Sequence, residues 1–507
     1  MAAGLMHSGL ESAAARFAHH PAVRFGDRSW TFHQLNAASD AVAAHLASQG
    51  IGRGDRVTVM TSNRPEFDAV VHGVSKAGAA AMLLNPQWKM LEVQAAIELT
   101  SPRYAFADGN AVGLLCESIG EERVVDLDGA AAAAVLESSA AAAPAASVAA
   151  RSDDAVLVFS SGTTGRPKAV RHTHASIGLA TAHWCQTLGL GHGDRFQVAT
   201  PPSHILGLIN LLGAAAAGVT VRLHPRFDLE EELHWIVAER MTLEMAVAPI
   251  ALAMANHPTL ERYDLSSLRY IMWGATPVTA SVAETVTARS GVRWLPAYGA
   301  SELPVIAANP VADPDAWRLD STGLPVGDVT LRVVDLDRAD VLEPGGVGEV
   351  QAKSASTMAG YLPADATADA FADGWYRTGD VGWLEPEGWV HLTDRCKEMI
   401  KVSGFQVAPA EIEAVLHGHP AVVDCAVFGV PDERTGEVPV AAVQVDQGAT
   451  VSAAELAHLV EDTLATYKRL RHVVFVDVVP RTASGKVLRR ELREELAPTL
   501  GGRMGAS

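Results

Sequence analysis

Apolar residues recur along this chain in two patterns that alternate with each other. Residues 35–46 place Leu, Ala, Val and Leu three or four positions apart, which predicts one buried face of a helix. Short unbroken apolar runs at 57–60, 79–84 and 155–159 are typical of buried strands. Strands that alternate with helices predict an α/β fold in which helices cover both faces of a parallel sheet.

One glycine-rich turn occurs twice in the chain. Residues 51–57 read Ile-Gly-Arg-Gly-Asp-Arg-Val, and residues 190–196 read Leu-Gly-His-Gly-Asp-Arg-Phe. Each turn leads into an apolar run. The pair therefore predicts two similar, doubly wound α/β subdomains and not a solenoid.

The composition and the hydrophobic pattern of the sequence change in its last third. From about residue 320, glycine, proline and aspartate separate short alternating runs, which favours a β-rich subdomain. After residue 394 a smaller α+β unit follows, with a helix predicted over 409–417. We therefore predict a large N-terminal domain, residues 1–394, and a small C-terminal domain, residues 395–507.

Charge and composition narrow the functional classes. The formal net charge of −19 argues against general binding to nucleic acid or to a membrane surface. Without a run of 18 apolar residues or a basic, apolar leader, we expect no membrane span, no signal peptide and a cytoplasmic protein. Four widely spaced cysteines fit a reducing compartment without a structural metal. His172/His174 and His417/His419 have no third ligand nearby, so we expect solvated histidines there.

A polar stretch, residues 160–168 (Ser-Ser-Gly-Thr-Thr-Gly-Arg-Pro-Lys), follows the predicted strand at 155–159. Its glycines let backbone N–H groups turn toward an anion, its hydroxyls add donors, and Lys168 adds a point charge. The combination suits a triphosphate, although it is not the P-loop pattern. The alternative is a polar surface turn between two strands.

This stretch resembles the phosphate loop of the adenylate-forming superfamily, which includes acyl- and aryl-CoA synthetases, adenylation domains of peptide synthetases, and luciferases. The resemblance covers nearly the whole chain, since further motifs of the family follow in the family's order. Residues 401–413 are most similar to the 4-coumarate–CoA ligase-like branch. The resemblance therefore implies that residues 1–394 form an AMP-binding domain and that the C-terminal domain is mobile.

Four later motifs carry the resemblance. Residues 298–302 (Tyr-Gly-Ala-Ser-Glu) are similar to an aromatic-Gly-x-Thr-Glu motif, with serine in place of threonine. Residues 376–380 and 394–401 match the motifs that hold the ribose and contain the hinge, and residues 480–486 resemble the loop of the catalytic lysine. The implied ATP- and AMP-binding residues are Ser160, Ser161, Gly162, Thr163, Thr164, Lys168, Gly274, Ala275, Thr276, Tyr298, Gly299, Ser301, Glu302, Asp380, Arg395 and Lys486.

The resemblance also implies roles for single residues. Lys486 would bridge the acyl carboxylate and the α-phosphate. Glu302 and Thr163 would hold Mg²⁺ with hard oxygens. Asp380 would accept hydrogen bonds from both ribose hydroxyls, and Arg395 would hold ribose and phosphate oxygens.

The implied acyl pocket departs from the family at two positions. His204 would line the channel near the carboxylate as a catalytic residue, and Leu206 and Leu303 would form apolar walls. Trp273 and Ala297 stand where smaller residues are usual, although Trp273 is equally well explained as a core aromatic. An apolar lining predicts a hydrophobic or aromatic carboxylic acid.

A further group of residues would serve the acceptor thiol. Arg226, Lys401, Ser403 and Gly404 are assigned to coenzyme A, because a glycine lets a narrow pantetheine tunnel pass the backbone. Lys397 aligns with the residue about which the small domain rotates.

Together these features imply an AMP-forming acid–thiol ligase, an acyl-CoA synthetase that uses ATP, Mg²⁺ and coenzyme A. It would form acyl-AMP and pyrophosphate first, and an acyl-CoA thioester and AMP after domain rotation. Relatives that load an acyl carrier protein or oxidise the adenylate share the fold. An alternative of another class is a nucleotide-binding regulator without turnover. We expect a monomer or homodimer.

Overall fold

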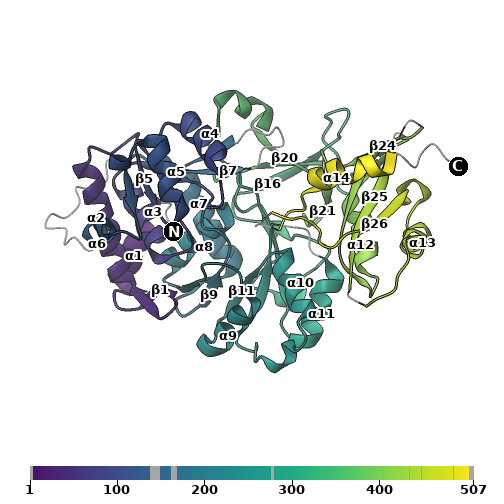
Figure 1. Ribbon diagram of the computed structural model, residues 1–507, viewed down its shortest axis with the longest axis horizontal. Helices are drawn as coiled ribbons and strands as arrows, with labels where there is room; N and C mark the ends of the chain where they lie inside the picture. Colours follow the sequence, from purple (N-terminus) through teal and green to yellow (C-terminus); the bar gives the residue numbers. More distant parts are fainter. Residues whose placement is uncertain are drawn as a thin grey trace.

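The computed structural model describes residues 4–136, 149–160, 168–275, 279–403, 405–432, 434–446, 448–482 and 485–501. Of the predicted site residues, those outside these ranges are Ser161, Gly162, Thr163, Thr164, Thr276 and Gly404. The order of helices and strands confirms an α/β fold with a large N-terminal part and a small C-terminal part (Figure 1).

A seven-stranded sheet organises the first subdomain, in the order β18-β8-β7-β4-β3-β5-β6. The pairs from β7 to β6 are parallel, whereas β8 is antiparallel to both of its neighbours. The strands are β3 (Arg56–Met60), β4 (Ala80–Leu83), β5 (Tyr104–Ala107), β6 (Val124–Asp126), β7 (Asp154–Ser160), β8 (Lys168–Thr173) and β18 (Gly360–Leu362).

Two further sheets continue the large domain. The first has the order β2-β1-β10-β9, and the second has the order β11-β12-β13-β14-β15. The repeated glycine turns lead into β3 and β9, which lie in different sheets, as two separate subdomains require. The strands are β1 (Pro21–Phe25), β2 (Arg28–Thr31), β9 (Arg195–Val198), β10 (Thr220–Leu223), β11 (Leu243–Ala246), β12 (Tyr270–Trp273), β13 (Trp294–Tyr298), β14 (Ala307–Ala308) and β15 (Leu324–Pro325).

The β-rich subdomain expected after residue 320 is an antiparallel sheet in the order β16-β17-β20-β19, with β21 paired to β20. A fifth sheet, β23-β22-β25-β24 with β26 on β25, belongs to the small domain. The strands are β16 (Thr330–Val334), β17 (Gly348–Lys353), β19 (Phe371–Ala372), β20 (Trp375–Leu384), β21 (Val390–Arg395), β22 (Ile400–Val402), β23 (Phe405–Val407), β24 (Val422–Asp432), β25 (Gly436–Val445) and β26 (His472–Phe475).

Helices cover the sheets of both domains, and the small domain lies at the opposite end of the molecule from α2 and α6 (Figure 1). The predicted helix at 409–417 is α12. The helices are α1 (Ser8–Arg16), α2 (Phe32–Ser48), α3 (Pro65–Lys76), α4 (Met90–Thr100), α5 (Asn110–Ile119), α6 (Ala130–Leu136), α7 (His174–Leu188), α8 (Ile205–Ala217), α9 (Leu229–Glu239), α10 (Ala248–Asn256), α11 (Ala280–Ser290), α12 (Pro409–His417), α13 (Ala453–Thr463) and α14 (Arg489–Gly501). Within the described ranges, none of these helices has the length and apolarity that crossing a bilayer requires.

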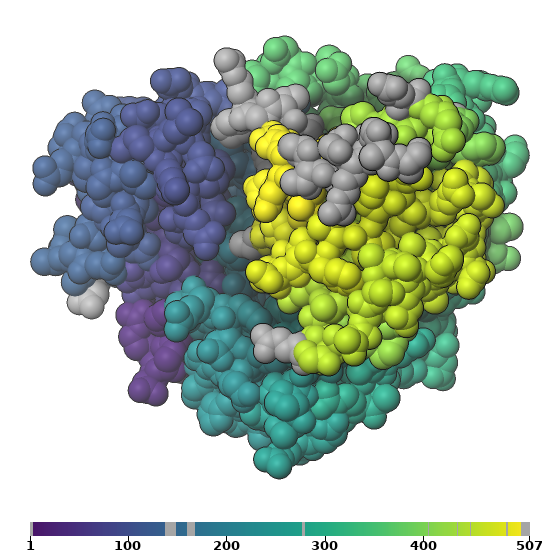
Figure 2. Space-filling model, turned by 45° about the vertical axis from the view of Figure 1, so that its right-hand side comes forward, coloured from purple at the N-terminus to yellow at the C-terminus, as the bar shows by residue number. Residues whose placement is uncertain are grey.

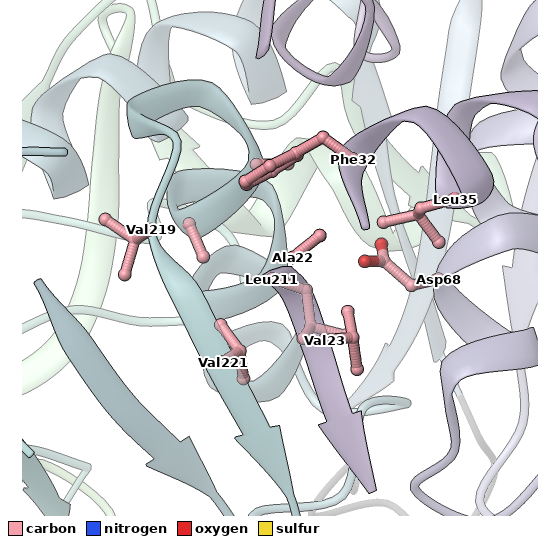
Figure 3. Close-up of a pocket in the computed structure, with 10 residues that line it drawn as sticks. Ala22, Val23, Phe32, Leu35, Asp68, Leu211, Val219 and Val221 are labelled. Atoms are coloured by element: carbon pink, nitrogen blue, oxygen red, sulfur yellow. The ribbon is translucent and has the colours of Figure 1, made fainter. Parts of the chain in front are cut away.

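A small cavity lies between β1, β10, α2, α3 and α8 (Figure 3). It measures about 10 Å³, room for one water molecule, and Asp68 turns its carboxylate toward it. The other lining side chains are apolar. A cavity of this size belongs to the core of the fold and cannot hold an organic substrate.

The expectation of solvated histidines is wrong for His172 and His174. Both are fully buried, at 0% exposure. Burial lowers the pKa of His172 and lowers that of His174 to about 4. The sequence pattern misleads because His172 stands among the polar residues Arg171 and Thr173 at the end of β8 and His174 begins α7, yet both side chains are buried by the surrounding fold.

Candidate active site

Side chains from several sheets meet at one place between the two domains. Tyr298 ends β13, Asp380 lies in β20, and Arg395 ends β21. The small domain adds Lys486 from the loop before α14. In the space-filling view a furrow separates the blue first subdomain from the yellow small domain (Figure 2).

Tyr298, Asp380 and Arg395 form what we call the Asp380 cluster. The Tyr298 hydroxyl donates a hydrogen bond to Asp380 Oδ2, and Arg395 Nε lies 2.7 Å from Asp380 Oδ1. The strand register explains the second contact, since Asp380 pairs directly with Arg395 across β20 and β21. Burial raises the pKa of Asp380, an effect that Arg395, Tyr298 and Lys486 oppose. The carboxylate is therefore buried, with each oxygen held by one donor.

Glu302, Tyr361 and Lys168 form a second group, the Glu302 cluster. The Tyr361 hydroxyl donates to Glu302 Oε1 at 2.6 Å. Lys168 Nζ lies 5.5 Å from the centroid of the Tyr361 ring, within the range of a cation–π contact. Glu302 is only 9% exposed, so its carboxylate is largely shielded from solvent.

The loop that carries Glu302 is fixed through its backbone. His172 Nε2 lies 2.8 Å from the carbonyl oxygen of Ser301, and Met358 donates its N–H to the carbonyl oxygen of Glu302 at 2.7 Å. A Cβ atom at Gly299 would lie 2.0 Å from the Pro304 carbonyl oxygen, so only glycine fits there. The Tyr-Gly-Ala-Ser-Glu motif thus has a rigid backbone, which sets where Glu302 points.

The Lys486 loop is held inside the small domain. Arg481 makes two hydrogen bonds to Asp424, at 2.7 and 2.9 Å, and donates a third to the Gly485 carbonyl oxygen at 2.8 Å. Gly485 has φ +85°, a left-handed conformation that favours glycine, and turns the chain just before Lys486.

The charge of Lys486 is coupled to groups of both clusters. Burial by surrounding protein and the charge of Arg395 lower its pKa, whereas Asp380 and Glu302 raise it. Lys486 is nevertheless exposed to solvent. The charges of Asp380, Glu302 and Arg395 therefore all act on the ammonium group of Lys486, which belongs to the small domain.

His204 caps the N-terminus of α8, and its Nδ1 accepts a hydrogen bond from the Leu206 N–H at 3.3 Å. Burial, with a smaller effect from Lys486, lowers the pKa of His204 to about 4, so the ring is neutral near pH 7. Leu206 and Ala297 are half-buried, and Leu303 is fully buried. The imidazole thus adds no positive charge beside these apolar residues.

Trp273 lies in the core. It is 1% exposed and packs on Trp294, with ring centroids 5.0 Å apart, in a cluster on the α10–α11 side of the sheet. This packing favours the core-aromatic alternative, and a role in the acyl pocket stays a prediction. Ala275 follows with φ +66°, an uncommon backbone conformation for alanine.

Of the residues assigned to coenzyme A, the structure describes Arg226, Lys401 and Ser403, and all three are exposed. Arg226 follows β10, and Lys401 and Ser403 lie in and after β22 of the small domain. The Ser403 N–H donates to the Thr435 carbonyl oxygen at 2.7 Å. Their roles, the hinge at Lys397 and the domain boundary at 394/395 stay predictions.

Two residues at the site carry no signal in the motifs. His172 supports the Ser301 backbone, and Tyr361 bonds Glu302. The signal that could have drawn attention to His172 is its place in the sequence, four residues after the phosphate-loop stretch. Tyr361 lies far from both partners in sequence, and only the pairing of β18 with β8 brings it to the site.

Two family models match this chain. The AMP-binding enzyme model matches residues 10–362, and the AMP-binding enzyme C-terminal domain model matches residues 411–486. The chain belongs to the AMP-binding enzyme family. Resemblance to the adenylate-forming superfamily is thereby confirmed over both domains.

Other members of the AMP-binding enzyme family are similar over nearly the full length. The 4-coumarate–CoA ligase 1 of Solanum tuberosum is 32% identical over 97% of this chain and 94% of its own. The structure of the anthranilate CoA ligase AuaEII with anthranoyl-AMP has a TM-score of 0.91 at 26% identity and covers 98% of both chains. The amide bond synthetase McbA from Marinactinospora thermotolerans has a TM-score of 0.87 at 29% identity, over 96% of this chain and 99% of that one.

These similarities confirm the predicted place near the 4-coumarate–CoA ligase-like enzymes. They also confirm the predicted enzyme class, an AMP-forming acid–thiol ligase, at the level of the family.

Proposed function

We propose that this protein is an ATP-dependent acyl- or aryl-CoA synthetase that activates a hydrophobic carboxylic acid through an acyl-AMP intermediate. One observation carries the proposal. Lys486 of the small domain lies close enough to Asp380 and Glu302 of the large domain, and to Arg395 at the end of β21, for their charges to shift its pKa. An ammonium group placed there suits a reaction in which two anions, a carboxylate and the α-phosphate of ATP, must approach each other.

In the first step the acid's carboxylate oxygen attacks the α-phosphorus, and pyrophosphate leaves. Asp380 accepts hydrogen bonds from the ribose hydroxyls, for which Tyr298 and Arg395 hold its two oxygens in place. Lys486 donates to the carboxylate and to the α-phosphate as negative charge develops. The neutral His204 lies beside the carboxylate without fixing it as an ion pair.

The Glu302 cluster fits a magnesium ion bound together with the phosphates. Glu302 offers a hard carboxylate oxygen, and Lys168 supplies a cation near the same place. Among the described residues, no set of three or more His, Cys, Asp or Glu side chains suits a metal. One carboxylate plus substrate phosphates is the usual way in which proteins bind Mg²⁺, which neutralises phosphate charge.

In the second step the small domain rotates about Lys397 and withdraws Lys486. The thiol of coenzyme A then attacks the acyl carbon, AMP leaves, and the thiol proton passes to solvent or a basic group. Lys401, Ser403 and Gly404 would accompany the pantetheine chain. The apolar Leu206 and Leu303 support a hydrophobic acid, and relatives named for 4-coumarate and anthranilate support an aromatic one.

The deciding experiment measures pyrophosphate release across a panel of acids: cinnamic and benzoic acids, medium-chain fatty acids, and malonate as a doubly charged control. We expect release with aromatic or aliphatic acids and none above background with malonate. Mass spectrometry with coenzyme A, a pantetheinylated carrier protein or a primary amine then identifies the acceptor. If none of the acids in the panel causes pyrophosphate release, the proposal is overturned in favour of a nucleotide-binding regulator.

A further inference from the structure

The strand β18 joins a distant part of the chain to the predicted phosphate loop. It pairs antiparallel with β8, which begins at Lys168, and Tyr361 lies opposite Val170 in this pairing. The adjoining Ala359 N–H donates to the Arg171 carbonyl oxygen at 2.8 Å. A short strand held in this way places the Tyr361 side chain at a fixed point beside the first residue of β8.

Tyr361 contacts two groups of opposite charge. Its hydroxyl donates a hydrogen bond to Oε1 of Glu302 at 2.6 Å, which fixes the orientation of the carboxylate. The face of its ring meets Lys168 Nζ at 5.5 Å, where the negative potential of the ring attracts the ammonium group. One side chain therefore orients both the predicted metal ligand and the predicted phosphate ligand.

The hydrogen bond between a tyrosine and a carboxylate resembles the outer contacts of metal sites. Such contacts orient the ligand, and their loss commonly lowers metal affinity by about 10- to 100-fold. A structural explanation also exists, since the Tyr361 ring packs against the core of the large domain. Removal of the hydroxyl alone distinguishes positioning of Glu302 from packing of the ring, because phenylalanine keeps the ring and its packing.

We infer that Tyr361 is a positioning residue for the metal–triphosphate complex, which it serves by orienting Glu302 through its hydroxyl and Lys168 through its ring. This inference rests on the proposed function, because it presumes that Glu302 holds the metal of Mg·ATP. Tyr361 itself touches no reacting atom and is therefore not a catalytic residue. Its loss should impair the nucleotide–metal complex and spare acyl transfer.

The test compares Tyr361→Phe and Tyr361→Leu with Tyr263→Phe. Tyr263 is a matched control, because its hydroxyl also donates to a glutamate, the exposed Glu230, away from the site. Mn²⁺ is titrated by electron paramagnetic resonance in the presence of a non-hydrolysable ATP analogue and without acid. We expect the Mn²⁺ dissociation constant of Tyr361→Phe to rise about tenfold and that of Tyr263→Phe to stay within twofold.

Two further measurements locate the effect. The rate of acyl-AMP formation in Tyr361→Phe should recover as Mg²⁺ is raised, whereas thioester formation from supplied acyl-AMP should equal that of the wild type. Tyr361→Leu should weaken binding of the ATP analogue about threefold beyond the phenylalanine variant, the size of a modest cation–π contact.

Several outcomes would overturn the inference. An unchanged Mn²⁺ affinity in Tyr361→Phe, or equal loss in both half-reactions, would leave Tyr361 a packing residue. Absence of Mn²⁺ binding by the wild-type complex would remove the metal that Tyr361 is said to position. Because the titration needs no acid, it still reports on Tyr361 if every acid in the panel fails and the proposed function is wrong.

Discussion

The large and small domains hold their parts of the active site by different means. In the large domain, Asp380 and Glu302 are buried, and each is fixed by a tyrosine hydroxyl from another strand of the same domain. In the small domain, the Arg481–Asp424 contact fixes the Lys486 loop only relative to its own domain. The position of Lys486 in the site depends on where the whole small domain lies.

This difference between the two domains agrees with the step of the proposed reaction in which each group is needed. Nucleotide-binding groups serve both steps of the proposed reaction, so they gain from a preorganised scaffold. In the proposed reaction Lys486 serves only the first step, and other groups take its place in the second. A side chain that is needed in only one of two steps is suitably placed on a mobile domain, as in other enzymes whose domains alternate.

The largest effect should come from Lys486→Ala. Loss of one preorganised donor at developing negative charge costs about 10²–10³ in rate, roughly 3–4 kcal/mol. We expect acyl-AMP formation to fall by at least this factor and thioester formation from supplied acyl-AMP to stay near wild type. Each half-reaction is assayed separately in rapid-quench experiments. Equal damage to both steps would show that Lys486 does not leave the site, and the comparison between domains would fail.

The next effect should come from the predicted hinge. Proline fixes φ near −65°, so Lys397→Pro should restrict the rotation that exchanges the two arrangements. We expect the thioester step to slow at least tenfold, about 1.4 kcal/mol, relative to adenylation. Circular dichroism checks that the fold is retained. A similar loss of rate in both steps would show that Lys397 is not the hinge residue.

The pH dependence of the two steps should separate the domains. Lys486 must be charged, and its pKa lies below the ordinary 10.5 because of burial and Arg395, so adenylation should decline as pH rises through that lowered value. Asp380 must be ionised, and burial raises its pKa, so nucleotide binding should weaken as pH falls, at a higher pH than for an exposed aspartate. Beyond each pKa the rate should change about tenfold per pH unit. A thioester step with the same alkaline decline would assign that decline to another group.

The smallest effect should come from Trp273→Phe. The tryptophan packs on Trp294 in the core, so the smaller ring should lower the free energy of unfolding by about 1–2 kcal/mol. The ranking of acid substrates should be unchanged. Urea unfolding and the acid panel measure the two quantities. A reordered panel would return Trp273 to the acyl pocket.

Sequence patterns predicted the parts of the fold that depend on neighbours in sequence. Alternating periods gave the α/β class, and the doubled turn before β3 and β9 gave two subdomains. The motif at 376–380 led to Asp380, which the structure places against Tyr298 and Arg395.

What the sequence could not predict depends on partners far along the chain. A three-residue strand such as β18 has too few positions to show a period, so its pairing with β8 and the role of Tyr361 were hidden. His172 was misjudged for the same reason, because hydropathy reports whether a residue type is usually buried and not what covers it. Trp273 was ambiguous because either face of β12 accepts a large ring.

The late strand β18 has a consequence for synthesis on the ribosome. The edge of β8 stays without a partner until residues 360–362 emerge, almost two hundred residues after β8 itself. At about 5–20 residues per second, the first sheet would wait some ten to forty seconds with an open edge. Exposed edges invite pairing with other chains, and strand pairing across long separations is slow. A fragment that ends before residue 360 should therefore aggregate, whereas one that extends past residue 362 closes its own sheet.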